Sequence, residues 1–553
     1  MCIRDRDGIS DGTASNITTD FSPNSGSPRP AIGHYPAASG YPFDGKISNL
    51  RVTVGEPVYT SGFKPPTEPL TTTSQVTSSS NVKLLCCNVI SNATGSTVTP
   101  AAISNNGTNP VAYGNNPFDD PAGFVFGENG DQGVVKCGRY IGNGASDGPE
   151  INLGWEPQWI LIKHNSGENW VQFDSMRGVV SDHKDAFLIP NSNASEDYGG
   201  WWLDFIDFTS TGFKIKSNYN LVNQNNGEYL FLAIRMPDGY VGKPAEVGTD
   251  VFTVVNGDTD GNAKTPWMLT PHYVDFALFK GRNITHNWGT SPRLTQGYYL
   301  SVNQTRAENA NIHQVFDFMD GFNDGTDTSG NYTGWLWKRH AGFDVVTWTG
   351  NGQNPRTFSH SLGRSPEMIW TKGRDSTYDW RVWHKDLNAG GSSAAAYNIV
   401  LNSTGVQSAN QDIFGGSSNV LPSSTNFTTG GNAGINESGT NQIAFLFASV
   451  DGISKVGSYD GTGVSGLTET TGFTPRFLII KNITWTHGDW FVYDTVRGWT
   501  SGTNSEVLTL NGAGGQSNSG THNTAPTSTG FSLVSTDTAV NASGQKYIYY
   551  AHA

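Results

Sequence analysis

One passage that occurs twice constrains most strongly what this chain can fold into. Residues 157–178 read PQWILIKHNSGENWVQFDSMRG, and residues 475–498 read PRFLIIKNITWTHGDWFVYDTVRG. Both begin with a proline and a short apolar run, pass through a lysine and a polar segment to a tryptophan, and end on Asp-x-x-Arg-Gly. The two copies stay in register to their last apolar runs, EYLFLAIR and KYIYYAHA. A block that recurs in register over this length indicates a repeated structural unit.

Two less well preserved copies lie between these. One begins at Pro366, has Lys372 and Trp380 in the lysine and tryptophan positions, and carries His384 in place of the aspartate. The other keeps only Lys280 and Trp288. The four lysines therefore recur at intervals of about 100 residues, a size that suits β-sandwich modules, whereas solenoid repeats have shorter periods of about 20 to 50 residues.

The composition supports β-structure. Gly (67), Phe (28), Tyr (20) and Trp (16) are abundant, only 15% of residues are charged, and no long segment has apolar residues at helical spacing. We therefore predict an all-β chain of tandem, jelly-roll-like β-sandwich modules joined by short linkers. The predicted boundaries are 1–70 for the remnant of another β domain, 71–135 for a Ser/Thr/Asn/Gly-rich connector, and 136–240, 241–340 (the divergent copy), 341–450 and 451–553 for the four repeats.

The residues that the copies share are interpreted as structural. Proline keeps the chain extended as it enters a strand, and WILI and FLII are continuous apolar runs, as in strands buried on both faces or in a sandwich core. The tryptophan anchors the next strand, and the Asp and Arg three residues apart can form an ion pair or hold the loop backbone. This structural signature comprises Lys163, Trp170, Asp174, Arg177, Lys280, Trp288, Lys372, Trp380, Lys481, Trp490, Asp494 and Arg497.

A second pattern lies in the N-terminal part. Its positions are Phe43, Gly45, Ile47, Leu50 and Arg51, followed by Tyr59, Phe63, Pro65 and Pro66. They closely resemble the closing strands of a laminin-G-like, concanavalin A-type jelly roll, whose earlier strands are absent, so we expect a truncated domain. Residues 1–6, MCIRDR, resemble translated sequencing adapter, and we expect this start to be artefactual.

Over residues 43–553, this remnant and the tandem repeats together resemble a family of large marine bacteriophage virion proteins. The resemblance implies a non-enzymatic structural component, such as a tail fibre or another host-recognition appendage. It implies location in the virion, extracellular action and other virion proteins as partners. It assigns no activity to the repeat, and homo-oligomerisation stays open.

Motifs for catalysis or metal binding are weak. GASDG (144–148) matches G-x-S-x-G, but turn residues surround it instead of a strand and a helix. The histidines are scattered, and the cysteines (Cys2, Cys86, Cys87 and Cys137) lack zinc-ligand spacing and are interpreted as free thiols. Acidic, Gly-rich loops at 256–262 and 320–327 leave weak calcium binding open. We therefore expect no catalytic residues, no metal site and no required cofactor.

Aromatic residues with polar neighbours are the remaining candidates for ligand binding. Flat aromatic faces suit sugars, so Trp201, Trp202, Trp335 and Trp337 are weak candidates for binding host surface glycans, with core filling as the alternative. Linked modules would raise the avidity of such weak sites.

The net charge and the hydropathy of the chain argue against two classes of interaction. The net charge is −14 without a Lys/Arg cluster, so no nucleic acid is expected, and no apolar run approaches the roughly 20 residues of a membrane span, so no membrane insertion is expected. Two alternatives stay open: a polysaccharide depolymerase, which needs two carboxylates facing across a groove, and a secreted bacterial adhesin.

Overall fold

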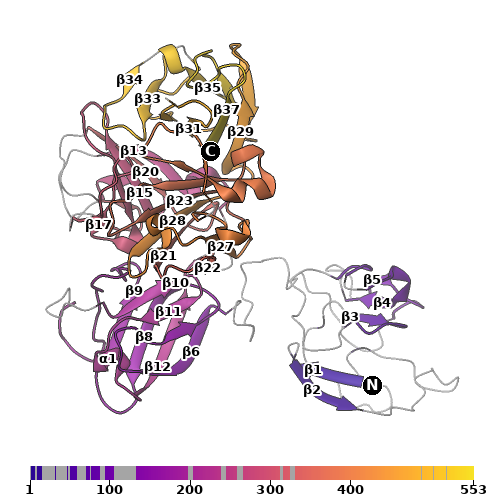
Figure 1. Ribbon diagram of the computed structural model, residues 1–553. Helices are drawn as coiled ribbons and strands as arrows, with labels where there is room; N and C mark the ends of the chain where they lie inside the picture. The colour runs from indigo at the N-terminus through magenta and orange to yellow at the C-terminus, as the bar shows by residue number, and fades with distance from the viewer. Residues whose placement is uncertain are drawn as a thin grey trace. The chain divides into compact units, whose positions relative to one another are not determined.

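The computed structural model divides the chain into two compact units, residues 1–133 and 134–553 (Figure 1). The structure describes residues 32, 47, 50–58, 70–74, 76–87, 94–104, 133–196, 204–237, 245–257, 266–311, 315–323, 331–410, 412–486, 488–501, 504–518 and 520–553, together with the backbone of 2–6 and 9–14.

The smaller unit contains five strands among its described residues. Strands β1 (Cys2–Arg6) and β2 (Ile9–Ala14) form an antiparallel pair, and β4 (Val82–Cys86) pairs with both β3 (Leu50–Thr53) and β5 (Ser96–Val98). Strands β4 and β5 fall within 71–135, which the sequence assigned to a connector. Of the jelly-roll pattern, Leu50 and Arg51 lie in β3, whereas Phe43, Gly45, Tyr59, Phe63, Pro65 and Pro66 lie outside the described residues.

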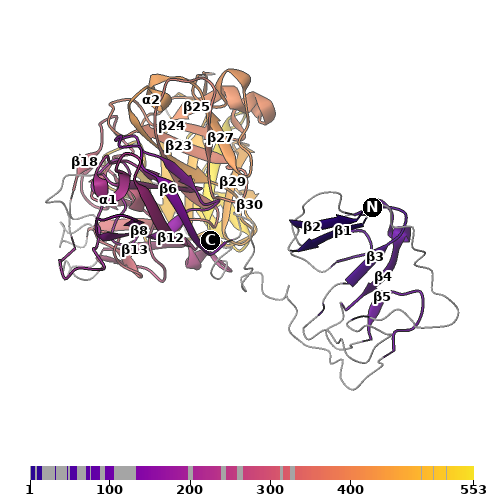
Figure 2. The same ribbon diagram turned by 90° about the horizontal axis from the view of Figure 1, so that it is seen from below.

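The larger unit repeats one sheet topology four times (Figures 1 and 2). In each large sheet, the last strand of the repeat lies between the first strand and the strand that carries the signature lysine, here called the lysine strand. The strand that begins at or just after the signature tryptophan, here called the tryptophan strand, lies on the other side of the lysine strand. The first repeat has the order β6 (Val135–Ile141), β12 (Glu228–Arg235), β8 (Pro157–His164), β9 (Trp170–Asp174). The second has β13 (Phe252–Asn256), β20 (Tyr332–Trp337), β15 (Phe276–Gly281), β16 (Gly289–Pro292).

The third and fourth repeats extend this order by two strands. The third has β21 (Phe343–Thr349), β28 (Asn441–Phe447), β23 (Met368–Gly373), β24 (Arg381–His384), β25 (Tyr397–Val400), β26 (Ser408–Ala409). The fourth has β29 (Ser454–Asp460), β37 (Lys546–His552), β31 (Phe477–Asn482), β32 (Trp490–Asp494), β33 (Glu506–Thr509), β34 (Ser517–Asn518).

Each repeat adds a smaller sheet. In the first repeat it consists of β10 (Ile206–Thr209), β11 (Gly212–Ile215) and β7 (Glu150–Asn152), and in the fourth of β30 (Leu467–Thr470), β36 (Gly530–Leu533) and β35 (Thr524–Thr527). In the third it is the pair β22 (Arg356–Ser359) and β27 (Asn426–Thr429). The second has the pair β14 (Met268–Leu269) and β19 (Gly321–Phe322), and a further pair, β17 (Tyr298–Tyr299) and β18 (Asn309–Ala310). Side chains of a large sheet and its small sheet enclose an apolar core, as Phe231 of β12 and Phe213 of β11 do in edge-to-face contact. The prediction of an all-β, tandem-sandwich fold is confirmed.

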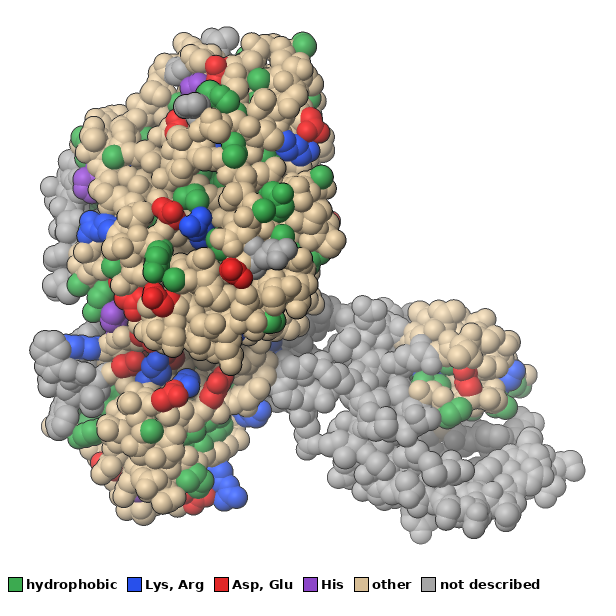
Figure 3. All heavy atoms as spheres, viewed as in Figure 1, with side chains coloured by type: hydrophobic (Ala, Val, Ile, Leu, Met, Phe, Trp, Pro, Cys, Tyr) green, Lys and Arg blue, Asp and Glu red, His purple; other side chains and the backbone are tan. Residues whose placement is uncertain are grey.

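Helix is scarce in the described part of the chain. Its two α-helices are α1 (Asn220–Asn223) and α2 (Ala433–Asn436), each a single turn. None of the helices there has the length and apolar character that a membrane span requires. On the side of the larger unit seen in Figure 3, most of the surface is uncharged, in keeping with the low content of charged residues.

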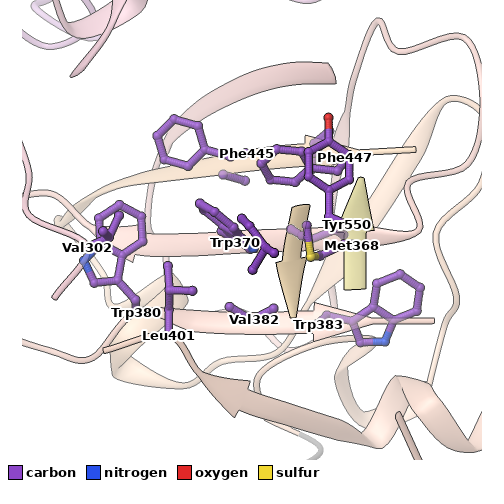
Figure 4. Packing of buried hydrophobic residues seen from close by; sticks show 14 of the residues in the cluster. Val302, Met368, Trp370, Trp380, Val382, Trp383, Leu401, Phe445, Phe447 and Tyr550 are labelled. Atoms are coloured by element: carbon purple, nitrogen blue, oxygen red, sulfur yellow. The ribbon is translucent and has the colours of Figure 1, made fainter. Parts of the chain in front are cut away.

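The large sheets of the second, third and fourth repeats also pack against one another. We call the face of a large sheet turned away from its small sheet the far face. Far-face rings meet in all three pairings: Phe276 lies 4.6 Å from Phe445, Phe252 lies 5.3 Å from Phe477, and Phe447 lies 5.0 Å from Tyr550, between ring centroids. The three far faces thus enclose one shared core, in which Val302, Trp370 and Tyr550 come from different repeats (Figure 4).

Both faces of the lysine strands in these three sheets are therefore buried, which explains their continuous apolar runs. Every residue of β15, β23 and β31 is buried. The sandwiches form a joint body here, whereas tandem modules joined by short linkers would each keep a core of their own. This merging was not expected from the sequence.

Candidate functional site: the repeat signature and its junctions

The signature lysines hold the hairpin between the lysine and tryptophan strands. The Nζ of Lys372 donates to the carbonyls of Gly373 and Ser376, both at 2.7 Å. Lys481 donates to Asn482 at 2.8 Å and Gly488 at 2.7 Å. Lys163 and Lys280 make corresponding bonds to carbonyls of their own hairpins. The lysine at this position therefore satisfies turn carbonyls that no sheet partner reaches.

Three of these lysines carry a perturbed pKa. Burial lowers the pKa of Lys280 and Lys372 to about 8 and that of Lys481 to about 7. A lysine with a pKa near neutrality can act as a general base or a nucleophile when a substrate reaches it. These three side chains are 0% exposed and donate to carbonyls of their own hairpins. Lys280 and Lys481 also donate to Ala513 and Thr404 of a neighbouring repeat, so the arrangement holds the hairpin and the junction beside it.

The signature tryptophans are fixed by an asparagine that the sequence analysis missed. The backbone N–H of the tryptophan donates to an asparagine Oδ1 in every repeat, over 2.9 to 3.1 Å. The pairs are Trp170 with Asn191, Trp288 with Asn303, Trp380 with Asn402 and Trp490 with Asn511. The number of residues between the partners varies in an Asn-rich chain, so no sequence spacing singled these asparagines out.

The tryptophan side chains join neighbouring repeats. The indole Nε1 of Trp490 donates to the carbonyl of Val400 in the third repeat at 3.1 Å, and that of Trp380 donates to Ser301 in the second at 3.0 Å. The indole of Trp288 returns to the fourth repeat, donating to Thr509 at 2.9 Å. In each case the acceptor lies two residues before the asparagine that holds the neighbour's own tryptophan. These three contacts form a closed ring, and the second, third and fourth repeats are its members.

Backbone hydrogen bonds follow the same ring. The N–H of Glu308 donates to Arg374 O at 2.6 Å, that of Gln407 to Ile483 O at 3.2 Å, and that of Gln516 to Arg282 O at 2.6 Å. Each donor lies five residues after the asparagine of its repeat, and each acceptor lies two residues after the signature lysine of the next. The three junctions are therefore equivalent, as in a three-membered ring with approximate threefold symmetry.

The Asp and Arg of the two full signatures do form ion pairs. Arg497 Nε donates to Asp494 Oδ2 at 2.5 Å, and both side chains are 0% exposed. The same Oδ2 accepts from Trp335 Nε1 at 3.0 Å, so the pair also touches the second repeat. In the first repeat, Arg177 Nε donates to Asp174 Oδ2 at 2.7 Å, with the two side chains 18% and 14% exposed.

His384, which replaces the aspartate in the third repeat, is fully buried. Its ring Nδ1 accepts from the N–H of Asp386 at 3.1 Å. Burial lowers the pKa of His384 to about 3, so the ring is neutral at physiological pH. A neutral side chain at this position cannot replace the charge of the aspartate, and it serves as a packed hydrogen-bond acceptor.

A network of charged residues joins the first repeat to the ring. The buried guanidinium of Arg374 donates to Asp182 Oδ2, Glu308 Oε2 and Ser181 O, each at 3.0 Å. His183 also contacts Glu308, at 2.9 Å. Residues of three repeats thus meet at Arg374, which suits a structural junction.

Among the described residues, a close group of three carboxylates lies beside this junction. Oxygens of Asp182, Asp204 and Asp207 lie within 4.8 Å of one another. Burial and the neighbouring carboxylates raise the pKa of Asp204 to about 10 and that of Asp207 to about 6. Lys216 Nζ lies 2.7 Å from Asp182 Oδ1 and 3.3 Å from Asp207 Oδ2. The lysine thus supplies the positive charge that a cation would bring, so the group fits an ion network better than a metal centre.

Two of the four candidate tryptophans for ligand binding are buried in the structure. Trp335 and Trp337 are 0% and 1% exposed in the shared core, so neither indole can contact a dissolved glycan. Their size and apolar rings explain this position at the centre of three sheets. Trp201 and Trp202 lie outside the described residues, as do 258–262 and 324–327 of the two acidic loops.

Comparison with known proteins gives one match. No curated protein and no solved structure is significantly similar to the chain. The model of a family described as a domain of unknown function, DUF7483, matches residues 70–236 and 274–553. These segments cover most of the chain, including nearly every strand of the four repeats. The chain therefore belongs to the DUF7483 family, whose function is not known.

Proposed function

We propose that this chain is a non-enzymatic structural protein of a phage particle, a component of a tail fibre or another appendage. The observation that supports a structural role is the use of the repeat signature. Its lysines satisfy turn carbonyls, and three of its tryptophans tie one repeat to the next. The residues shared among the repeats thus make the larger unit rigid, and a rigid unit suits an appendage that bears mechanical load.

The assignment to a phage rests on the resemblance of residues 43–553 to virion proteins. Host surface glycans are the proposed ligands of the appendage, with other virion proteins as its attachment partners. Because Trp335 and Trp337 are buried, Trp201 and Trp202 are the aromatic candidates that still carry the glycan proposal.

Immunogold labelling of purified phage particles whose genome encodes the chain tests the virion location. We expect antibodies against the recombinant chain to label an appendage. Labelling confined to bacterial cells would instead favour a secreted adhesin.

A glycan array and a reducing-end assay on host polysaccharide test the ligand and the absence of catalysis. We expect binding that falls in the double variant Trp201→Ala/Trp202→Ala and persists in Tyr378→Ala, a surface aromatic that is 40% exposed. Release of reducing ends by the purified chain would overturn the non-enzymatic assignment and favour a depolymerase.

A further inference from the structure

The far face of the first repeat is open, whereas the same face is covered in the other three. On β12, Leu230 and Ile234 are 50% and 37% exposed. The strand register places Ile548 and His552 of β37 at the same positions, and each is only 1% exposed. The four strands that these sheets share have the same order and register, so the difference lies in what packs against the far face.

The signature tryptophan shows the same contrast. Trp288, Trp380 and Trp490 are at most 1% exposed, because each is covered by the neighbouring repeat of the ring. Trp170 occupies their position in the first repeat and is 39% exposed. Its backbone is held by Asn191, as in the other repeats, so the indole is already positioned for such a junction.

The open face is mainly apolar, although Arg139 lies on it opposite Leu230 and pairs with Glu228. Its exposed or half-buried apolar residues come from three adjacent strands: Val135 and Cys137 on β6, Leu230, Leu232 and Ile234 on β12, and Trp159 and Leu161 on β8. A contiguous apolar sheet face of this kind marks an interaction surface. In the ring, such a face is covered by two further sandwiches of the same repeat.

We propose that three copies of the chain associate through the far faces of their first repeats, forming a threefold ring equivalent to the ring of the second, third and fourth repeats. The partner surface that fits this face is already present within the chain, as a sandwich of the same topology. A homotrimer supplies three such sandwiches with identical junctions, which closes the ring. The inference does not depend on the virion assignment.

The equivalence of positions specifies the contacts between copies. Val400 lies two residues before Asn402, and Ile189 lies two residues before Asn191, so Trp170 Nε1 is expected to donate to Ile189 O of the next copy. By the same rule, Glu196 N–H is expected to donate to Asn165 O. Residues 190–195, beside these positions, are exposed in the single chain, as a free partner surface requires.

The mass of the full chain in solution tests the proposal. Multi-angle light scattering at micromolar concentration should give three times the chain mass of 59.5 kDa. Leu230→Asp places a charge in the apolar face and should reduce the mass to that of one chain. Leu269→Asp is the matched control, because Leu269 is 56% exposed on the small sheet of the second repeat and should leave the trimer intact.

A wild-type chain that is monomeric or dimeric would overturn the proposal. A trimer that persists in Leu230→Asp would overturn it too. Circular dichroism checks that the variant folds, and Trp170→Ala, at an exposed side chain, provides a second and milder disruption.

Cys137 gives an independent readout of the interface. It is the exposed thiol among the described cysteines, and its register partners in the ring, Val254, Val345 and Val456, are at most 6% exposed. Maleimide labelling, located by peptide mass spectrometry, should therefore be at least about tenfold slower in the wild type than in Leu230→Asp. Equal labelling rates at Cys137 would show that the face is open in solution and would contradict the proposal.

Discussion

Trp490 donates from its indole Nε1 to the carbonyl of Val400 over 3.1 Å and thereby ties the fourth repeat to the third. The same bond, from the same position of the repeat, links the third repeat to the second and the second to the fourth. One donor and one acceptor per repeat thus convert a linear series of sandwiches into a ring.

Trp490→Phe keeps an aromatic ring in the shared core but removes the donor to Val400. We expect the free energy of unfolding of the larger unit to fall by about 1 to 3 kcal/mol, because the acceptor loses its partner in a buried setting. Denaturant titration followed by circular dichroism measures the loss. The control Tyr378→Phe, at a side chain 40% exposed, should change it by less than about 0.5 kcal/mol. Equal effects of the two substitutions would contradict a structural role of the indole N–H.

Asp494→Asn removes the charge that compensates Arg497 but keeps an acceptor for Trp335. Because the guanidinium is then buried without a counter-charge, we expect a loss of about 3 to 5 kcal/mol in the free energy of unfolding. Asp174→Asn makes the same change in the first repeat, where both side chains of the pair are partly exposed, and should cost about 1 kcal/mol or less. Denaturant titration compares the two variants, and similar losses would show that burial does not set the contribution of the pair.

His384 should make the larger unit less stable in acid. Burial lowers the pKa of His384 to about 3, below the value of 6.5 expected in the unfolded chain. The unfolded state therefore binds the additional proton between about pH 6.5 and 3, and stability falls as the pH falls through this window, by about 1.4 kcal/mol per pH unit.

The variant His384→Gln should make this decline shallower, measured as the denaturation midpoint against pH. It should not abolish the decline, because burial also lowers the pKa of His552 to about 3. The variant His286→Gln, at an exposed position, should retain it. A His384→Gln profile that matches the wild type would place the acid sensitivity elsewhere.

Arg374→Met removes the guanidinium at which residues of three repeats meet. Asp182 and Glu308 then lose a buried counter-charge, and we expect the junction between the first repeat and the ring to open more often. Hydrogen exchange should accelerate at residues 181–184 while strands β28 and β37 of the shared core stay protected. Arg381→Met, at a side chain 25% exposed, is the control and should leave the exchange at 181–184 unchanged.

The sequence determined the local structure of each repeat. Alternation of apolar runs, turn residues and anchor aromatics is a property of neighbouring residues, and it indicated four β-sandwich modules and an Asp–Arg pair at Asp494 and Arg497. It also showed that both faces of strands such as FLII are apolar, because such a run has no polar alternation.

Only the tertiary structure decided what covers those faces. Trp288 reaches Thr509 across more than two hundred residues, and no local pattern encodes a hydrogen bond between an indole and a backbone carbonyl, which every residue carries. For the same reason the sequence left Trp335 and Trp337 as candidates for either core or ligand binding. An apolar strand face specifies that it must be buried, and the packing of the whole chain selects the surface that buries it.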